Sequence, residues 1–229
     1  MNELGLTRAA ATALRTAMFR PRGWKTYTWQ VEVAGRSLVI KDVRNCHPLF
    51  RFTIGRWLIR REAGIYRRLA GLDFVPQCFG RLDRDALVLE YLPAPSLTHC
   101  PEHRLAPEFF PRLAAQIGEL HGRGIVHLDL RHRSNILVAA DGSPRLIDFQ
   151  SSIDLRRHAW IRWLFARQLI QVDLAGLLKW RMRYAPHAVG PAEHAWYARF
   201  RAWRGFWLVG RSGQQASAAA ASLRKRRSG

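Results

Sequence analysis

The segment from His127 to Asp148 constrains the fold more than any other part of the 229-residue chain. Its first part, HLDLRHRSN, is a loop that crowds a histidine, an aspartate, several basic side chains and an asparagine before the short apolar run 136–138. The turn signal Asp141-Gly142 and a second apolar run, 145–147, follow, and this pattern predicts a β-hairpin. A structural loop needs no such mixture of charges, so we expect this segment to carry chemistry.

Two oxygen-bearing side chains are predicted to meet at the open end of this hairpin. A register symmetric about the Asp-Gly pair places Asn135 opposite Asp148. Asp129 lies in the loop that feeds the same hairpin and brings a further carboxylate to the same place. Mg²⁺ takes oxygen ligands of this kind and shares them with substrate phosphates. Asn135 and Asp148 are therefore candidate metal ligands.

The chain before this segment predicts the elements that would position it. A helix opening at Pro107 and closing near Gly122 delivers the loop, because apolar residues recur there at helical spacing. Further upstream, residues 30–43 indicate a hairpin, with Lys41 emerging from an apolar strand.

A second helix and a further strand follow Lys41. Four apolar residues share one face of this helix: Leu58, Ile65, Tyr66 and Leu69. Glu62 lies at an interval and helical phase that let it point inward, so we expect it to pair with Lys41. Residues 87–92, LVLEYL, predict a buried strand that carries Glu90.

Taken in order, these motifs resemble the signature set of the protein-kinase-like fold. The set is Lys41 on a strand, Glu62 on the next helix, the strand LVLEYL, then HLDLRHRSN and IDF. The small size, the HxDL loop and IDF without a following glycine resemble more narrowly the bacterial lipopolysaccharide kinase family, which phosphorylates Kdo or heptose sugars of the core attached to lipid A. The resemblance covers roughly residues 20 to 185, and the ordered set is more specific than any single motif.

The resemblance implies an α+β, bilobal protein-kinase-like fold. Residues 1–92 would form a small β-rich N-terminal lobe, and residues 93–210 a helical C-terminal lobe with the catalytic loop and the metal-binding hairpin. Residues 211–229 are rich in Ala, Ser and Gln and end in LRKRRSG, so we expect a flexible basic tail there.

The resemblance also implies a role for each residue on the acceptor and metal side. Asp129 would orient or deprotonate the acceptor hydroxyl, and Arg131 would add positive charge at the transferred phosphate. Asn135 and Asp148 would hold the metal that bridges the ATP phosphates.

On the nucleotide side, Lys41 would touch the α and β phosphates, Glu62 would hold Lys41, and Glu90 would belong to the cofactor site. The implied cofactors are ATP and Mg²⁺. These residue types suit phosphoryl transfer, which asks chiefly for positioning and charge neutralisation.

The chain departs from the kinase pattern in several places. No G-x-G-x-x-G precedes the strand lysine, and Arg20, Arg22 and Lys25 are expected to replace backbone amides with charge. The catalytic loop has one residue more than usual. Leu128 replaces the arginine that reads activation-loop phosphate, which implies a constitutively arranged site. Gln150 replaces a glycine and no A-P-E follows, so the peptide-docking segment of protein kinases is missing.

Five other residues have alternative interpretations. We interpret His127 as a structural residue packing under the loop. Asp173 either supports the catalytic loop from below, as a helix aspartate does in kinases, or is an ordinary buried helix carboxylate. His99, Cys100 and His103 lack an apparent fourth ligand, so a loop is the better interpretation there than a zinc site.

Composition limits the compartment and the partners. The net charge of +20 favours anionic partners but does not choose among nucleic acid, acidic lipid and nucleotide phosphate. Three cysteines without a CxxC pair favour a reducing compartment. No apolar run reaches the ~18 residues that span a bilayer. We therefore expect a cytoplasmic protein that can lie on a membrane surface.

The chain after Leu155 is rich in arginine and tryptophan, a composition typical of membrane interfaces. We expect Trp163 and Trp180 to lie in the core of the larger lobe. Interface and core are equally supported for three later tryptophans, Trp196, Trp203 and Trp207.

Two classes of function follow from these observations. The first is an ATP-dependent kinase of a lipid-linked core sugar, peripheral to the inner membrane of a Gram-negative bacterium and attracted to its anionic surface; a serine/threonine protein kinase is the alternative enzyme. The second is a degenerate kinase scaffold that binds a membrane or nucleic acid. The complete set of catalytic residue types favours an enzyme and disfavours nucleic acid as the partner. The oligomeric state does not follow from the sequence.

Overall fold

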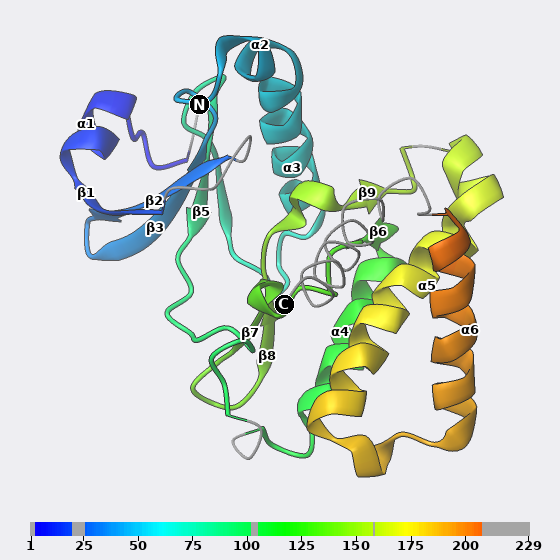
Figure 1. Ribbon diagram of the computed structural model, residues 1–229. Helices are drawn as coiled ribbons and strands as arrows, with labels where there is room; N and C mark the ends of the chain where they lie inside the picture. The colour runs from blue at the N-terminus through cyan, green and yellow to red at the C-terminus, as the bar shows by residue number, and fades with distance from the viewer. Residues whose placement is uncertain (1–2, 20–25, 102–104, 158, 208–229) are drawn as a thin grey trace, which may run out of the picture. The chain divides into compact units, whose positions relative to one another are not determined.

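The computed structural model describes residues 3–19, 26–101, 105–157 and 159–207 (Figure 1). The chain divides into two compact units, Met1–Leu177 and Leu178–Gly229. The first unit has a sheet-rich N-terminal part and a helical part, so the expected α+β class is confirmed. The lobe boundary expected at residue 92 falls inside this unit and, like that at residue 210, stays a prediction.

The N-terminal part is a five-stranded antiparallel sheet with the strand order β1-β2-β3-β5-β4. Its strands are β1 (Arg15–Phe19), β2 (Tyr27–Val33), β3 (Arg36–Asp42), β4 (Cys78–Arg81) and β5 (Ala86–Glu90). The predicted β2–β3 hairpin is present, and both Ala34 and Gly35 adopt a positive φ. Two such residues in succession are what a tight two-residue hairpin turn requires.

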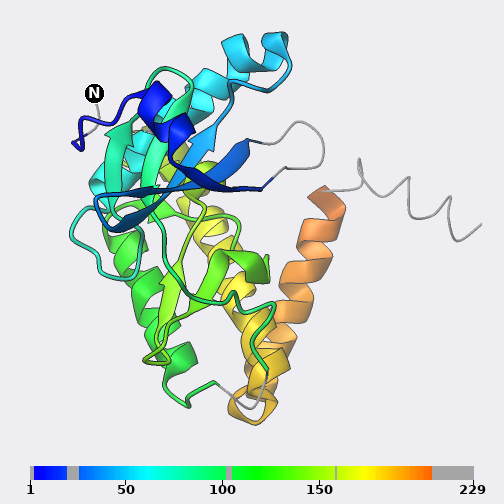
Figure 2. The same ribbon diagram turned by 90° about the vertical axis from the view of Figure 1, so that its left-hand side faces the viewer.

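Alternation along β2 and β3 gives the sheet two different faces. One face buries the apolar residues Trp29, Val31, Leu38 and Ile40. Helix α1 (Arg8–Ala13) packs on this cluster through Ala11 and lies beside the sheet in Figure 2. Lys41 projects from the opposite face, because successive side chains of a strand point to opposite sides.

A continuous helical stretch follows the β3 strand. It consists of α2 (Pro48–Phe50), the π-helix η1 (Arg51–Gly55) and α3 (Arg56–Arg68). Ile65, Tyr66 and Glu62 are buried on α3, as the sequence predicts.

The helical part of the first unit begins with α4 (Phe109–Gly122), just after the predicted start at Pro107. Strands β6 (Ile125–Val126) and β9 (Ile153–Asp154) pair with each other. Between them lie η3 (Arg133–Asn135), β7 (Ile136–Val138), β8 (Pro144–Leu146) and η4 (Phe149–Ser151). Helix α5 (Ala159–Tyr184) continues from this unit into the second.

The β7–β8 hairpin is present, but its register differs from the prediction by one residue. The N–H of Ile147 donates to the carbonyl of Asn135 at 3.0 Å, so Asn135 faces Ile147. The prediction that Asn135 pairs with Asp148 across the hairpin is therefore wrong.

The loop of this hairpin explains the difference. The N–H of Ala139 donates to the carbonyl of Ser143, which leaves three residues in the loop, and Gly142 has a φ of 76°. A turn followed by a left-handed glycine is the usual form of a three-residue hairpin loop. A two-residue turn at Asp141-Gly142 would pair Asn135 with Asp148. The three-residue loop moves each pairing partner on β8 by one residue, so Asn135 pairs with Ile147.

In the second unit, η5 (Pro186–Ala188) and α6 (Pro191–Trp207) follow the end of α5. Arg181 pairs with Glu193 at 2.6 Å, and Glu193 also accepts the N–H of Gly190 at 3.1 Å. Phe200 is buried on α6 and stacks on Trp196.

The burial of one tryptophan differs from the prediction. Trp180 is buried, as predicted, but Trp163 is 84% exposed, so its assignment to the core is wrong. The apolar residues at 160, 163 and 164 share one helical face, a pattern that normally marks a buried side. The first turns of α5 leave this face in water. Trp203 is 41% exposed.

Some predictions fall outside the described residues. These concern Arg20, Arg22 and Lys25, the residue His103 and the tail 211–229. The side chain of Trp207 is not described either. Among the described residues, no helix combines the length and apolar character needed to cross a bilayer.

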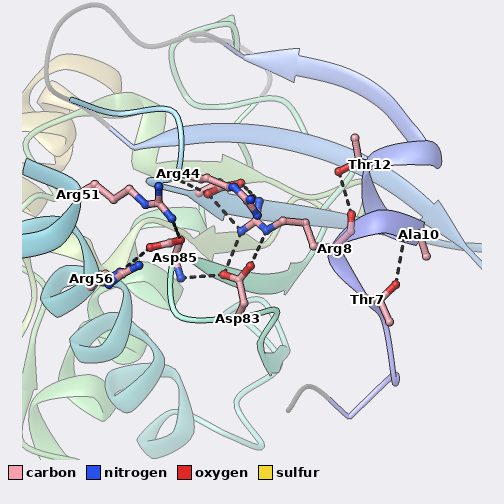
Figure 3. Close-up of polar contacts among 10 residues, drawn as sticks. Thr7, Arg8, Ala10, Thr12, Arg44, Arg51, Arg56, Asp83 and Asp85 are labelled. Atoms are coloured by element: carbon pink, nitrogen blue, oxygen red, sulfur yellow. Dashed lines mark hydrogen bonds and ion pairs between the residues drawn. The ribbon is translucent and has the colours of Figure 1, made fainter. Parts of the chain in front are cut away.

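One network of ion pairs joins α1 to the sheet (Figure 3). The guanidinium of Arg8 contacts Asp42 at the end of β3 and Asp83 in the β4–β5 turn, both at 2.5 Å. Because Asp42 and Arg8 are largely buried, this network fixes the helix to the two strands.

A second ion-pair group fixes η1 and the start of α3 to the same turn (Figure 3). Asp85 is buried and accepts hydrogen bonds from Arg51 at 2.5 Å and from Arg56 at 2.7 Å. Burial alone would raise the pKa of Asp85, but the hydrogen bonds from the two arginines outweigh it and lower this pKa to about 2.

The Asp85 carboxylate should contribute stability that is lost in acid. Because its folded pKa lies below the unfolded value, the contribution is present above about pH 4 and disappears as pH falls towards 2, with an upper limit of about 2 to 3 kcal/mol. The partly exposed arginines are screened by solvent, so we expect less than that limit. Urea unfolding of Asp85→Asn at pH 7 and at pH 2.5 measures it.

The matched control is Asp73→Asn, which removes the same charge from a side chain that is 90% exposed. We expect Asp85→Asn to lower the free energy of unfolding at pH 7 but much less at pH 2.5, and Asp73→Asn to change it little at either pH. An equal loss at both pH values would mean that the ion pairs do not stabilise the fold.

Candidate functional site

The centre of the candidate site is the ammonium group of Lys41. Its Nζ lies 2.6 Å from Oε1 of Glu62 on α3 and 2.6 Å from Oδ1 of Asp148 after β8. The sequence-predicted pair of Lys41 and Glu62 is therefore present, and Asp148 joins it from 107 positions further along the chain. Three separate elements converge on one charge.

The electrostatics of this group favour its charged form. Burial would lower the pKa of Lys41, but the two carboxylates outweigh burial and raise this pKa. Burial raises the pKa of Asp148, and Lys41 more than offsets this, so the pKa of Asp148 is lowered. Both groups are therefore charged at neutral pH, as a site for phosphates and metal ions requires.

Asp148 is held in an unusual backbone conformation. Its φ of 65° and ψ of 71° lie in the left-handed region, which costs a non-glycine residue of order 1 kcal/mol or more. The neighbouring Phe149 is buried and packs edge-on against Tyr66 of α3, with ring centroids 5.2 Å apart. The Asp148 side chain remains 41% exposed, so a metal ion or substrate can reach it.

Arg61 ties α3 to the residues that follow Asp148. Its guanidinium donates to the carbonyl of Gln150 at 3.1 Å and also to the carbonyl of Ser152. The side chain of Gln150 donates in turn to the Thr26 hydroxyl at 2.9 Å. The helix that carries Glu62 therefore also positions the segment that carries Asp148.

The loop of residues 127–135, which we call the catalytic loop, brings Asp129 and Asn135 together. Nδ2 of Asn135 donates to Oδ2 of Asp129 at 2.8 Å and to its carbonyl at 3.1 Å. His132 lies on the other oxygen, with Nδ1 2.5 Å from Oδ1 of Asp129. The longer loop thus accommodates its extra residue and still holds both predicted residues in one place.

Asp173 supports this loop from α5, so the first of its two interpretations is confirmed. Its completely buried carboxylate accepts the backbone N–H of His127 at 2.7 Å, the N–H of Leu128 at 2.7 Å and Nε2 of His121 at 3.0 Å. Leu128 has a φ of 66°, a strained conformation for a leucine. Two hydrogen bonds to one fixed carboxylate hold the loop in that conformation.

His127 is a structural residue, as predicted. It is fully buried, its Nε2 donates to the carbonyl of Ile147 at 3.1 Å, and its Nδ1 accepts the N–H of Asp129 at 3.3 Å. Burial lowers the pKa of His127. The neutral ring therefore links the loop to the hairpin, and both of its nitrogens are engaged in structural hydrogen bonds.

Two further predicted residues lie in the loop after His127 and at the end of β5. Arg131 is half-buried in the catalytic loop. Glu90 ends β5, and its carboxylate accepts the N–H of Gln77 at 2.9 Å, which makes it a bridge between neighbouring segments. The roles assigned to Arg131 and Glu90 stay predictions.

The donor set fits a hard divalent cation. Asp148 offers a partly exposed carboxylate. Asn135 is oriented by Asp129, and its amide oxygen, which accepts the Ser134 hydroxyl at 3.3 Å, has a second lone pair for another partner. Mg²⁺ is commonly held by one or two such ligands together with phosphate oxygens. Within the described residues, His, Cys, Asp and Glu side chains do not gather into a group of three or more, so a zinc-type cage is not present there.

Several residues of the site carried no recognisable sequence signal. Arg61 and His132 resemble ordinary surface residues in the sequence. Gly176 on α5 is another example, because an added Cβ would lie 3.0 Å from the backbone of Leu130 in the catalytic loop. Only a helix without a side chain at this position can approach the loop so closely.

Substitution of Asp173 should destabilise the fold strongly. Asp173→Asn replaces one acceptor oxygen by an NH₂ group that faces backbone donors, so a loss of about 3 kcal/mol of unfolding free energy is expected. Urea unfolding measures it, with the exposed neighbour Leu174→Ala as a control that should cost little. If Asp173→Asn loses less unfolding free energy than Leu174→Ala, the loop does not depend on the Asp173 carboxylate.

The comparisons with curated proteins identify kinases. No protein-family model matches the chain. Over 51% of its length it is 35% identical to the serine/threonine-protein kinase AfsK of Streptomyces coelicolor, and the match covers 15% of that protein. Over 25% of its length it is 40% identical to a PAS domain-containing serine/threonine-protein kinase of Mus musculus, and the match covers 4% of that protein. The chain thus matches only a small part of these longer relatives.

Solved structures extend the similarity over nearly the whole chain. The Rio2 kinase from Chaetomium thermophilum has a TM-score of 0.58 and 17% sequence identity, and the match covers 96% of this chain and 76% of that one. A complex of the same kinase with ADP/Mg²⁺ and phosphoaspartate has a TM-score of 0.57, 17% identity and coverage of 97% and 77%. At this level of identity the likeness establishes the fold. The chain has the protein-kinase-like fold that its ordered motifs predicted.

Proposed function

We propose that the chain is an ATP- and Mg²⁺-dependent phosphotransferase that acts on an alcohol group. The observation that carries the proposal is the convergence of Lys41, Glu62 and Asp148, each at 2.6 Å from its partner, beside a loop that holds Asp129 and Asn135 together. A scaffold that only binds would gain nothing from keeping these charges in a largely buried site. The similarity to a kinase solved with ADP and Mg²⁺ supports the same reaction class.

Each residue has a defined part in this proposal. Lys41, fixed by Glu62, neutralises phosphate charge on the nucleotide. Asp148 and Asn135 would hold Mg²⁺, which supplies charge neutralisation on the phosphates when it is bound. Asp129 orients the acceptor hydroxyl and receives its proton, and Arg131 adds positive charge at the transferred phosphate. Catalysis then depends on positioning and electrostatics.

We propose a sugar of the lipopolysaccharide core, Kdo or heptose, as the acceptor. Strand β9 ends at Asp154 and α5 begins at Ala159, which leaves no room for the long segment on which protein kinases dock a peptide. The net charge of +20 suits an acceptor attached to an anionic amphiphile. The enzyme would then work on the cytoplasmic face of the inner membrane of a Gram-negative bacterium.

A serine/threonine protein kinase is the second candidate. Both curated relatives are named serine/threonine-protein kinases, which favours a protein hydroxyl as the acceptor. The short connection between β9 and α5 supports the sugar more strongly, because it bears directly on where an acceptor can lie.

Asp148→Ala should abolish Mg²⁺-dependent binding of ATP. The substitution removes the charged member of the metal ligand pair and leaves the rest of the nucleotide site in place. Calorimetric titration of ATP with Mg²⁺, and again with a chelator, measures the effect. Equal affinity of the wild type for ATP with and without Mg²⁺ would contradict the metal assignment.

Asp129→Asn is the matched control, because it removes a carboxylate from the acceptor side of the same site. It should bind ATP nearly as well as the wild type and lose phosphoryl transfer by about 100-fold or more. A variant that keeps most of its turnover would place the acceptor-orienting group elsewhere.

Radiolabelled ATP offered with three acceptors in parallel tests the substrate. These are purified lipopolysaccharide core, a generic basic protein and nucleic acid, and we expect the label to enter the glycolipid alone. Label in the protein alone would establish the second candidate. Binding of ATP without transfer to any of the three would indicate a degenerate scaffold.

A further inference from the structure

The first unit exposes two groups of large apolar side chains, each at a helix start, which together we call the Trp57–Trp163 face. Its members are Leu49, Phe52, Ile54 and Trp57 in the helical stretch α2–η1–α3, and Trp160, Trp163, Leu164 and Phe165 at the start of α5. Their exposure ranges from 40% for Phe165 to 84% for Trp163. Soluble proteins rarely leave so many apolar residues together in water unless the surface binds a partner.

A hollow lies beside Trp57 in the first of these two groups. Trp57, Arg60 and Arg61 of α3 line it together with Arg157, which lies just before α5, and its volume is about 330 Å³. Figure 1 shows α2 at one end of α3 and the start of α5 to the side of it. The guanidinium of Arg61 lies 5.1 Å from the ring centre of Trp57. The two apolar groups lie at two helix starts of the same unit, and arginines line the hollow beside the first group.

The exposed charge of this surface is positive, because the acid that lines the hollow, Asp154, is only 6% exposed and pairs with Arg68 and Arg157. Residues 44–68 contain a single acid, Glu62, which is only 1% exposed, and residues 155–172 contain none. Arg51 and Arg56 flank the exposed ring of Phe52 at 5.0 and 4.5 Å. A partner of this face therefore has to offer both an apolar phase and a dense negative charge.

The half of the face formed by α2 and η1 is rigidly mounted. Arg51 and Arg56 both bond to the buried carboxylate of Asp85, which anchors η1 to the sheet (Figure 3). Gly55 lies so close to Val43 that an added Cβ would come within 3.2 Å of it. The apolar side chains thus protrude from a fixed base, so the surface is preorganised for binding.

We infer that the Trp57–Trp163 face docks on an anionic phospholipid bilayer. Tryptophan settles at the headgroup level, aliphatic side chains enter the boundary of the acyl chains, and arginines pair with lipid phosphates. Nucleic acid would use the arginines and aromatic rings but would leave Leu49, Ile54 and Leu164 in water. A second copy of the chain would bring like charge against like charge.

A single side chain, Arg61, contacts both this docking surface and the segment that carries Asp148. Arg61, which contacts Trp57 on the face, also donates to the carbonyl of Gln150 behind Asp148. The inference does not depend on the proposed function, because membrane binding is measured without ATP and phosphoryl transfer without a bilayer.

Flotation of the full chain with vesicles tests the inference. We expect binding to phosphatidylglycerol vesicles that weakens steeply as salt rises, and little binding to phosphatidylcholine vesicles. Trp163→Ser and Phe52→Ser change the two halves of the face, and each should weaken binding by about tenfold or more. Trp203→Ser on α6 is the matched control, because this tryptophan is also exposed on a helix, and it should bind like the wild type.

Arg60→Glu provides a second probe on the same face, because Arg60 is exposed and its reversal changes charge with little effect on packing. Circular dichroism confirms that each variant is folded. Loss of binding in Trp203→Ser, with Trp163→Ser and Phe52→Ser unaffected, would overturn the inference in favour of α6. Equal binding to both kinds of vesicle, or a preference for nucleic acid that the same variants abolish, would also overturn it.

Discussion

The ammonium group of Lys41 is the point on which the first unit depends. It joins the central strand β3, helix α3 through Glu62, and the segment after β8 through Asp148. A largely buried cation is costly to desolvate unless opposite charges surround it, and two carboxylates at 2.6 Å meet that requirement. The same arrangement keeps a positive charge and a reachable negative charge next to each other. A phosphate and its metal ion need this combination.

Buried polar groups at the back of the site hold the catalytic loop in a strained shape. Asp173 receives two backbone N–H groups, and His127 connects the loop to the hairpin. Leu128 and Asp148 both have left-handed backbones, which persist only where the surroundings determine them completely. The buried carboxylate of Asp173 stabilises this strained backbone, so Asp129 and Asn135 are already in position before a substrate binds. Preorganisation of this kind lowers the reorganisation needed during phosphoryl transfer.

Arginine serves two opposite purposes in this chain. Arg8, Arg51 and Arg56 pair with buried aspartates and anchor helices to the sheet. Arg60 is exposed, and the exposed tryptophans of the Trp57–Trp163 face lie among other basic residues. Three aspartates, Asp42, Asp83 and Asp85, therefore serve as anchors for arginines within the fold, while the chain as a whole keeps a net charge of +20. An anionic lipid surface fits that net charge, and it also fits a phosphate acceptor embedded in a membrane.

The sequence by itself determined many of the helices and hairpins, because helical phase, strand alternation and turn residues act over short distances, and the order of its motifs resembled that of the kinase-like fold. The interval between Lys41 and Glu62 predicted their ion pair, and the motif order predicted that Asp129, Asn135 and Asp148 belong to one functional segment. Tertiary structure decided the features that depend on contacts between distant parts of the chain. The three-residue loop with Gly142 set the hairpin register. In the described part of the chain no element covers Trp163, although its helical pattern resembles a buried face. Arg61 and Gly176 acquire their importance from segments far away in the chain, since a long-range contact depends on packing and leaves no periodic trace in the sequence.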